Sequence, residues 1–147
     1  MFVNDTTQKD LADFIAGWQV DGLGTRDAFV HLVELLLQND HSLISFHARP
    51  GITFSLRGHI AAEQGEEGPL CAMIDVIDDD PAQRWLSVCF YGEMITDPDG
   101  RGDFVPGGLL GQDALCFDYD AKDAELYSYI ARRVAESYEA CLATVNP

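Results

Sequence analysis

A run of alternating carboxylates, DPDGRGD, comes closest in this 147-residue sequence to the spacing of a ligand set. Its opening matches the D-x-D-x-x-G pattern that begins a calcium-binding loop. Arg101, however, stands where such a loop needs an oxygen ligand, and Gly108 stands where it needs a bidentate glutamate. We therefore expect no metal site. The carboxylates that a cation would have to use are Asp97, Asp99 and Asp103.

The four cysteines are the next residues that could do chemistry: Cys71, Cys89, Cys116 and Cys141. They lie far apart, with no C-x-x-C pair and no histidine at zinc spacing, so neither a zinc site nor a disulfide framework is expected. The sequence also lacks a G-x-S-x-G nucleophile motif and a phosphate-binding loop. We expect no catalytic residues and no cofactor, and we favour a protein that is not an enzyme.

Two apolar runs, Leu70–Ile77 and Trp85–Tyr91, flank an acidic turn and predict a β-hairpin. The register that pairs Val76 with Leu86 makes one face wholly apolar and brings Asp78 opposite Arg84. On the other face this register sets Met73 against Cys89, Asp75 against Ser87, Ile77 against Trp85 and Cys71 against Tyr91.

The segment from His41 to His59 alternates apolar and polar residues around a Pro50-Gly51 turn, which predicts a second hairpin. Pairing Ala48 with Ile52 places four apolar side chains on one face. They are Ile44, Phe46, Phe54 and Leu56.

Three segments with helical spacing of apolar residues complete the expected elements. One follows Asn4–Thr7, one runs from Thr25 to Asn39, and a long one begins with Asp120 as its cap. The glycine-rich stretch 92–113 is predicted to be a long connection with a short element at most, followed by a short strand at 114–118. The sequence therefore predicts one α+β domain over residues 1–147. It should have an antiparallel sheet of about five strands, two hairpins plus one short strand, packed against two N-terminal helices and a long C-terminal helix.

Joining the two hairpins in one sheet gives a second face that mixes aromatic, sulfur-containing and polar side chains. Such mixtures are typical of binding sites and interface cores, whereas a plain solvent face is mostly charged. The competing interpretation is that the glycine-rich connection covers this face and that Asp75 pairs with Arg57 beneath it. The ligand-binding or interface candidates are His47, Ser55, Arg57, His59, Met73, Asp75, Trp85, Cys89 and Tyr91.

The net charge of −16, from nine Lys and Arg against 25 Asp and Glu, argues against nucleic acid and anionic membranes as partners. No segment has the length and apolarity of a membrane span, and the N-terminus lacks a signal-peptide pattern. We expect a cytoplasmic protein.

The blocks FHARPGITFSLR and IDVIDDDPAQRWLSVCFYGEMITDPDGRGDFVPGGLLGQDALCFD, which span roughly Ser45 to Asp118, resemble a small family of uncharacterised bacterial proteins. This resemblance implies no activity for any residue. In size, acidity and element order the chain also resembles the secretion-chaperone class, a likeness at the level of fold alone.

These observations favour a non-catalytic binding or assembly domain that forms a homodimer. The alternative is an enzyme or sensor domain that binds a small anionic ligand on the mixed face. A third possibility is an acidic, chaperone-like module that binds another protein.

Overall fold

The computed structural model describes residues 1–62 and 65–146. Within them lie three helices and a six-stranded antiparallel sheet of order β1-β2-β3-β4-β6-β5. The helices are α1 (Asp5–Gly17), α2 (Arg26–Leu37) and α3 (Ala124–Val145). The strands are β1 (Ser42–Arg49), β2 (Thr53–Ala61), β3 (Glu67–Ile77), β4 (Trp85–Tyr91), β5 (Asp103–Leu109) and β6 (Gln112–Tyr119). The α+β class, the antiparallel sheet and the order of the helices are confirmed.

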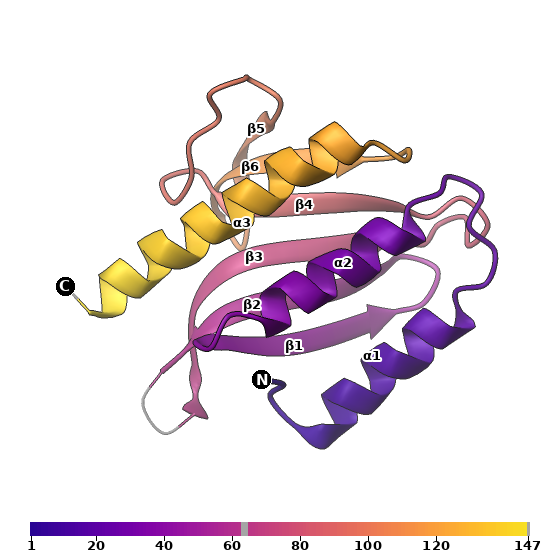
Figure 1. Ribbon diagram of the computed structural model, residues 1–147, viewed down its shortest axis with the longest axis horizontal. Helices are drawn as coiled ribbons and strands as arrows, with labels where there is room; N and C mark the ends of the chain where they lie inside the picture. The colour runs from indigo at the N-terminus through magenta and orange to yellow at the C-terminus, as the bar shows by residue number, and fades with distance from the viewer. Residues whose placement is uncertain (63–64, 147) are drawn as a thin grey trace.

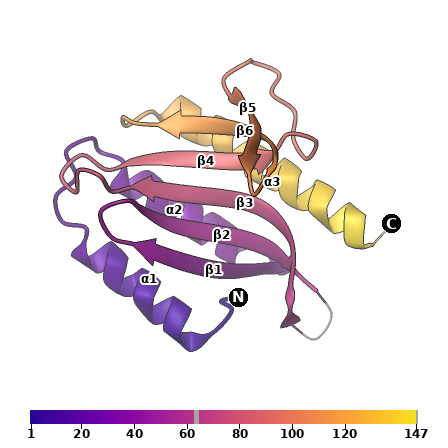
Figure 2. The same cartoon turned by 180° about the vertical axis from the view of Figure 1, so that it is seen from behind.

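All three helices pack on the same face of the sheet (Figure 1). Seen from behind, the other face carries no helix, and β5 turns across one end of it (Figure 2). We call this second surface the open face. None of the described helices is both long and apolar enough to span a membrane.

The helix starts follow from side-chain capping of free backbone amides. The Asn4 carboxamide accepts from the amide of Thr7 at 2.8 Å and begins α1. The N-cap of α3 is Asp123, which accepts from the amide of Leu126 at 3.0 Å, so the prediction of Asp120 as the cap is wrong by three residues.

Aromatic side chains from α1, α2 and the first hairpin fill the core beneath the N-terminal helices. Phe14 stacks on Phe54 with ring centroids 4.1 Å apart, and Trp18 is almost fully buried beside them. The Arg84 guanidinium lies over these rings and binds Asp78 with an Nε–Oδ1 distance of 2.7 Å. The predicted Asp78–Arg84 contact is therefore confirmed, and it ties the turn between β3 and β4 to α1.

The predicted register of the second hairpin is confirmed from Met73 opposite Cys89 to Ile77 opposite Trp85. The first hairpin differs, because Ala48 pairs with Phe54 and not with Ile52. Its loop closes one residue later, with the Ile52 amide donating to the Arg49 carbonyl at 2.9 Å. This change shifts the pairing by two residues, which keeps every side chain on its predicted face since strands have a period of two.

The sheet has six strands and not about five, because the glycine-rich connection contains β5, which forms a hairpin with β6. Its turn depends on Leu110 and Gly111, which have φ angles of 50° and 84°. The sequence of β5 includes Pro106 and two glycines, which predicts a broken segment. An edge strand tolerates proline because one side of its backbone needs no ladder hydrogen bonds.

A bulge in β3 moves Cys71 away from its predicted place. The register between β2 and β3 shifts after Gly58, so that His59 pairs with Leu70. Cys71 then points to the helix side, where the Ser137 hydroxyl of α3 donates to its carbonyl at 2.6 Å. The predicted pairing of Cys71 with Tyr91 is wrong.

Candidate functional site

The open face gathers the predicted candidates from strands that are far apart in the sequence. Residues paired across neighbouring strands share a face, so the registers define rows that cross the sheet. The first row is Ser45, Arg57, Met73, Cys89 and Cys116. The second row is His47, Ser55, Asp75, Ser87 and Asp118. The third row is Arg49, Thr53, Ile77 and Trp85.

The part of this face on β1 and β2 is basic. Arg57 donates to the Ser55 hydroxyl at 3.3 Å, and Arg49 donates to that of Thr53 at 3.1 Å. Among the described residues, neither guanidinium lies within 4.0 Å of a carboxylate. This is unusual in a chain with 25 acidic residues, where a cation would readily find a partner.

Two histidines extend the basic part. His47 lies beside Ser45, at 3.2 Å from its hydroxyl, and its pKa is lowered by burial and by the nearby Arg57. His59 contacts the Gly68 carbonyl at 3.1 Å and lies 3.8 Å from Glu67. The two histidines therefore differ in their surroundings, since a carboxylate lies within ion-pair distance of His59.

The opposite part of the face, on β3, β6 and β5, is acidic. Burial raises the pKa of Asp118, and the charges of Asp103 and Asp120 raise it further. The Oδ1 atom of Asp75 is buried and accepts no hydrogen bond from the described residues. The expected pairing of Asp75 with Arg57 is not formed within 4.0 Å in the part of the chain that the structure describes.

A small second core lies at one end of the open face. Leu109, at the end of β5, is buried there against Leu70, Met73, Cys89, Ala114 and Cys116. The neighbouring Phe104 and Leu110 remain 61% and 63% exposed. The glycine-rich segment therefore covers part of the face, as the competing interpretation holds, and leaves the rows through His47 and Trp85 uncovered.

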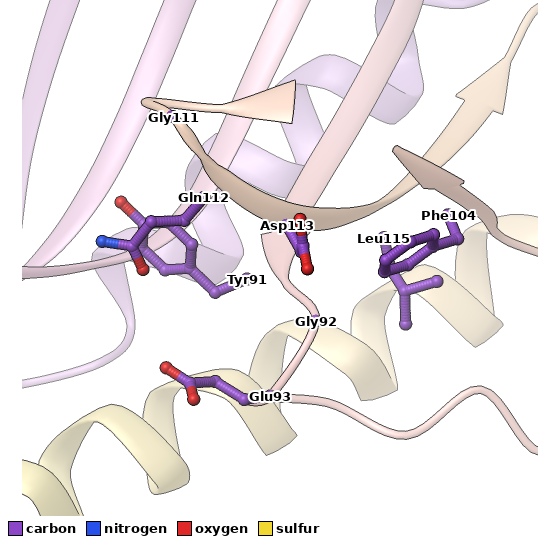
Figure 3. Close-up of a pocket in the computed structure, with 8 residues that line it drawn as sticks. All are labelled: Tyr91, Gly92, Glu93, Phe104, Gly111, Gln112, Asp113 and Leu115. Carbon is purple, nitrogen blue, oxygen red and sulfur yellow. The ribbon is translucent and has the colours of Figure 1, made fainter. Parts of the chain in front are cut away.

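A cavity of about 590 Å³ opens beside the β5–β6 hairpin (Figure 3). Its polar groups include Glu93, Asp113 and the phenol of Tyr91, whose pKa is raised by burial. Asp113 accepts from the amide of Gly107 at 3.0 Å, so one of its oxygens is engaged. These lining residues contain no histidine, cysteine or serine, and they do not form a nucleophile–base pair. The lining residues are Tyr91, Gly92, Glu93, Phe104, Gly111, Gln112, Asp113 and Leu115.

The Asp97 carboxylate is occupied by protein donors. It accepts from the amides of Arg101 at 3.0 Å and Gly102 at 2.9 Å, and from the hydroxyl of Tyr129. Asp99 contributes its amide to the Tyr129 oxygen, at 3.2 Å. No cluster of three potential metal ligands occurs in the described residues. The DPDGRGD run works here as a loop closed by its own aspartate.

Comparison of the chain with family models, with curated proteins and with solved structures found no match. The fold and the site define an α+β domain with helices on one side of an antiparallel sheet and a charged, partly apolar face on the other.

Proposed function

We propose that this protein is a non-catalytic assembly domain that forms a homodimer through its open face. The observation that carries the proposal is the division of this face, which the glycine-rich segment covers only in part, into a basic part and an acidic part. A surface divided in this way is complementary to a second copy of itself, because a twofold axis can lay each part over its opposite.

Sheets that pack face to face lie about 10 Å apart with their strands aligned to within about 30°. An axis parallel to the strands, between β3 and β4, lays β2 of one copy over β6 of the other. Ser55 then lies over Asp118 of the second copy, and Arg57 and His47, the neighbours of Ser55 along β2 and on β1, are the basic side chains nearest that carboxylate. The same arrangement brings Asp75, with its unpartnered oxygen, over the Ser87 hydroxyl of the second copy, which is a hydrogen-bond donor.

The edges of the sheet are less suited to assembly than its face. The Val3 amide donates to the Ile44 carbonyl at 2.9 Å, and the Ile44 amide donates to the Met1 carbonyl at 2.8 Å, so the N-terminal segment covers β1. The opposite edge, β5, carries Pro106, which has no amide to donate. Partner pairing through an added strand is therefore disfavoured on both sides.

The proposal is tested by reversing one charge in each part of the face. Arg57→Glu and Asp118→Arg should each weaken the dimer, since each places like charges together at both contacts. An equimolar mixture of the two variants should recover a dimer, because one contact is then native and the other has its charges exchanged. The readout is the solution mass, against 16.2 kDa for one chain.

A matched control is Arg132→Glu, which reverses an exposed charge on α3, on the helix side of the sheet. This variant should retain the mass of the unmodified protein. A monomeric unmodified protein, or single variants that keep the dimer, would show that the open face does not mediate self-assembly.

The second candidate function, binding of a small anion, is favoured by Arg49 and Arg57, which have no carboxylate within 4.0 Å among residues 1–62 and 65–146. Inorganic phosphate or citrate should then raise the melting temperature by mass action, and Arg57→Glu should abolish that rise. This result in a monomeric protein would support the anion site and contradict the homodimer. We place either activity in the cytoplasm, where the four free cysteines would stay reduced.

A further inference from the structure

The four cysteines, which are far apart in the sequence, meet as two pairs in the fold. Cys89 on β4 lies directly opposite Cys116 on β6, and both belong to the small core beneath Leu109. Cys71 on β3 and Cys141 on α3 are neighbours in the main core. All four are free thiols.

The backbone geometry of the Cys89–Cys116 pair suits a disulfide. In the same register, the Gly92 amide donates to the Asp113 carbonyl at 3.1 Å, which makes that pair a hydrogen-bonded one. Hydrogen-bonded and non-hydrogen-bonded pairs alternate along an antiparallel ladder, so Cys89 and Cys116 form a non-hydrogen-bonded pair. Such pairs have Cα atoms about 4.5 Å apart, within the range of roughly 4.4–6.8 Å that a disulfide spans.

Two hydrogen bonds favour a thiolate on Cys89. The one with the Cys116 thiol lowers the pKa of Cys89 most, and one with the Ser87 hydroxyl adds to this, while burial and the charges of Asp75 and Asp118 oppose both. The same hydrogen bond, together with burial, raises the pKa of Cys116. Since the thiolate is the nucleophile, Cys89 is the member of the pair that reacts first.

We propose that Cys89 and Cys116 are a site of reversible oxidation, at which a peroxide converts two thiols into one intramolecular disulfide. The Cys89 thiolate attacks the peroxide O–O bond, forms a sulfenic acid and releases hydroxide, which leaves as water after taking up a proton. Cys116 then attacks the Cys89 sulfur, the S–S bond forms, and the sulfenic oxygen leaves as a second water. One peroxide is reduced, and the two cysteines together lose two electrons and two protons. The inference does not depend on the proposed homodimer.

The second pair provides a control within the same molecule. Cys71 and Cys141 are 2% and 0% exposed between β3 and α3, whereas Cys89 and Cys116 are 8% and 9% exposed beside the uncovered part of the open face. A thiol hydrogen bond lowers the pKa of Cys141 as it does that of Cys89, so access decides between the pairs, and a small oxidant should reach the pair between β4 and β6 first.

The test treats the folded protein with hydrogen peroxide, removes the excess, and alkylates remaining thiols in denaturant. Trypsin cuts after Arg84, Arg101 and Lys122, which places all four cysteines in different peptides. The expected result is a cross-linked peptide pair containing Cys89 and Cys116, with the other two cysteines alkylated and the cross-link reversed by dithiothreitol. The proposal would be overturned if Cys71 and Cys141 became cross-linked before the other pair. It would also be overturned if all four cysteines were still alkylated after a peroxide treatment strong enough to oxidise the amino acid cysteine in solution.

A variant distinguishes attack by Cys89 from incidental cross-linking. In Cys116→Ser no intramolecular cross-link can form at this site, so the sulfenic acid on Cys89 should persist and react with dimedone. The matched variant Cys141→Ser should still form the Cys89–Cys116 cross-link at the rate of the unmodified protein. Failure of dimedone to label Cys116→Ser, with its fold retained by circular dichroism, would contradict the assignment of Cys89 as the reacting thiolate.

Discussion

At the scale of single residues, the DPDGRGD run shows how a ligand-like pattern can serve a loop. The Asp97 carboxylate satisfies two backbone amides and the Tyr129 hydroxyl, which joins this loop to α3. A hydrogen bond to a charged group contributes about 1.5–3 kcal/mol to the free energy of unfolding. The spacing of acidic residues alone does not distinguish this role from metal binding.

We predict that Asp97→Asn lowers the free energy of unfolding by roughly 1.5–3 kcal/mol near neutral pH, because the neutral amide replaces a charged acceptor. Burial raises the pKa of Asp97, but its hydrogen bonds from Tyr129, Gly102 and Arg101 together bring it below the ordinary value of 3.8. The stabilisation is therefore present above pH 3.8 and is lost as the pH falls below 3.8 through the folded-state pKa.

Denaturant unfolding across this pH range measures the effect. Asp99→Asn is the matched control, since its amide and not its carboxylate makes the described contact, and we expect a change within about 0.5 kcal/mol. Equal losses in the two variants would mean that the Asp97 hydrogen bonds do not stabilise the loop.

At the scale of elements, α3 approaches β2 so closely that only a glycine fits at the crossing. A Cβ atom placed on Gly58 would lie 2.1 Å from the Tyr138 hydroxyl oxygen. That hydroxyl lies 2.7 Å from the Ser42 hydroxyl, in hydrogen-bond contact with it, so the tyrosine cannot move without loss of this buried contact. Gly58 therefore sets the distance between the helix and the sheet.

We predict that Gly58→Ala costs about 1–3 kcal/mol in the free energy of unfolding, as overpacking of a closed site does. Gly17→Ala is its control, because a Cβ there meets no atom within 4 Å and alanine is the better helix former. Gly17→Ala should leave stability unchanged or raise it by up to about 1 kcal/mol. A neutral Gly58→Ala in thermal and denaturant melts would show that α3 can move away from β2.

At the scale of the whole molecule, the sheet carries its helices on one side, and the charged rows through Arg57 and Asp118 lie on the other. Trp85 lies in the third row of the open face, next to the turn between β3 and β4. It is only partly buried, and it would lie close to the proposed twofold axis. Tryptophan residues at the centre of an interface often carry a large share of the binding free energy.

We predict that Trp85→Ala raises the dissociation constant of the dimer about thirtyfold, which corresponds to roughly 2 kcal/mol. Sedimentation over a range of concentrations measures this change. Val20→Ala, at an exposed apolar residue outside the open face, should leave the constant unaltered. Lower stability with an unchanged association constant would identify Trp85 as a structural residue.

Local sequence patterns were sufficient to predict the two hairpins, the helices and, except at the bulge that turns Cys71, the faces of the first four strands. Each of these features depends on a period, 3.6 or two residues, and a period is read along the chain without knowledge of its partners. The contact of Asp78 with Arg84 could also be predicted from the sequence, because a short turn brings the two residues together. The first hairpin also kept its faces when its register differed by two residues.

Contacts between distant segments required the tertiary structure. The bulge that turns Cys71 toward α3 and the pairing of Cys89 with Cys116 both depend on which strands become neighbours. The sixth strand was missed because the proline and glycines of β5 predict a loop unless the strand is known to lie at an edge. The separation of charges across the open face arises in the same way, since the order β1-β2-β3-β4-β6-β5 places Arg57 and Asp118 on opposite sides of one surface. Strand order follows from the packing of the whole chain, and no period along the sequence encodes it.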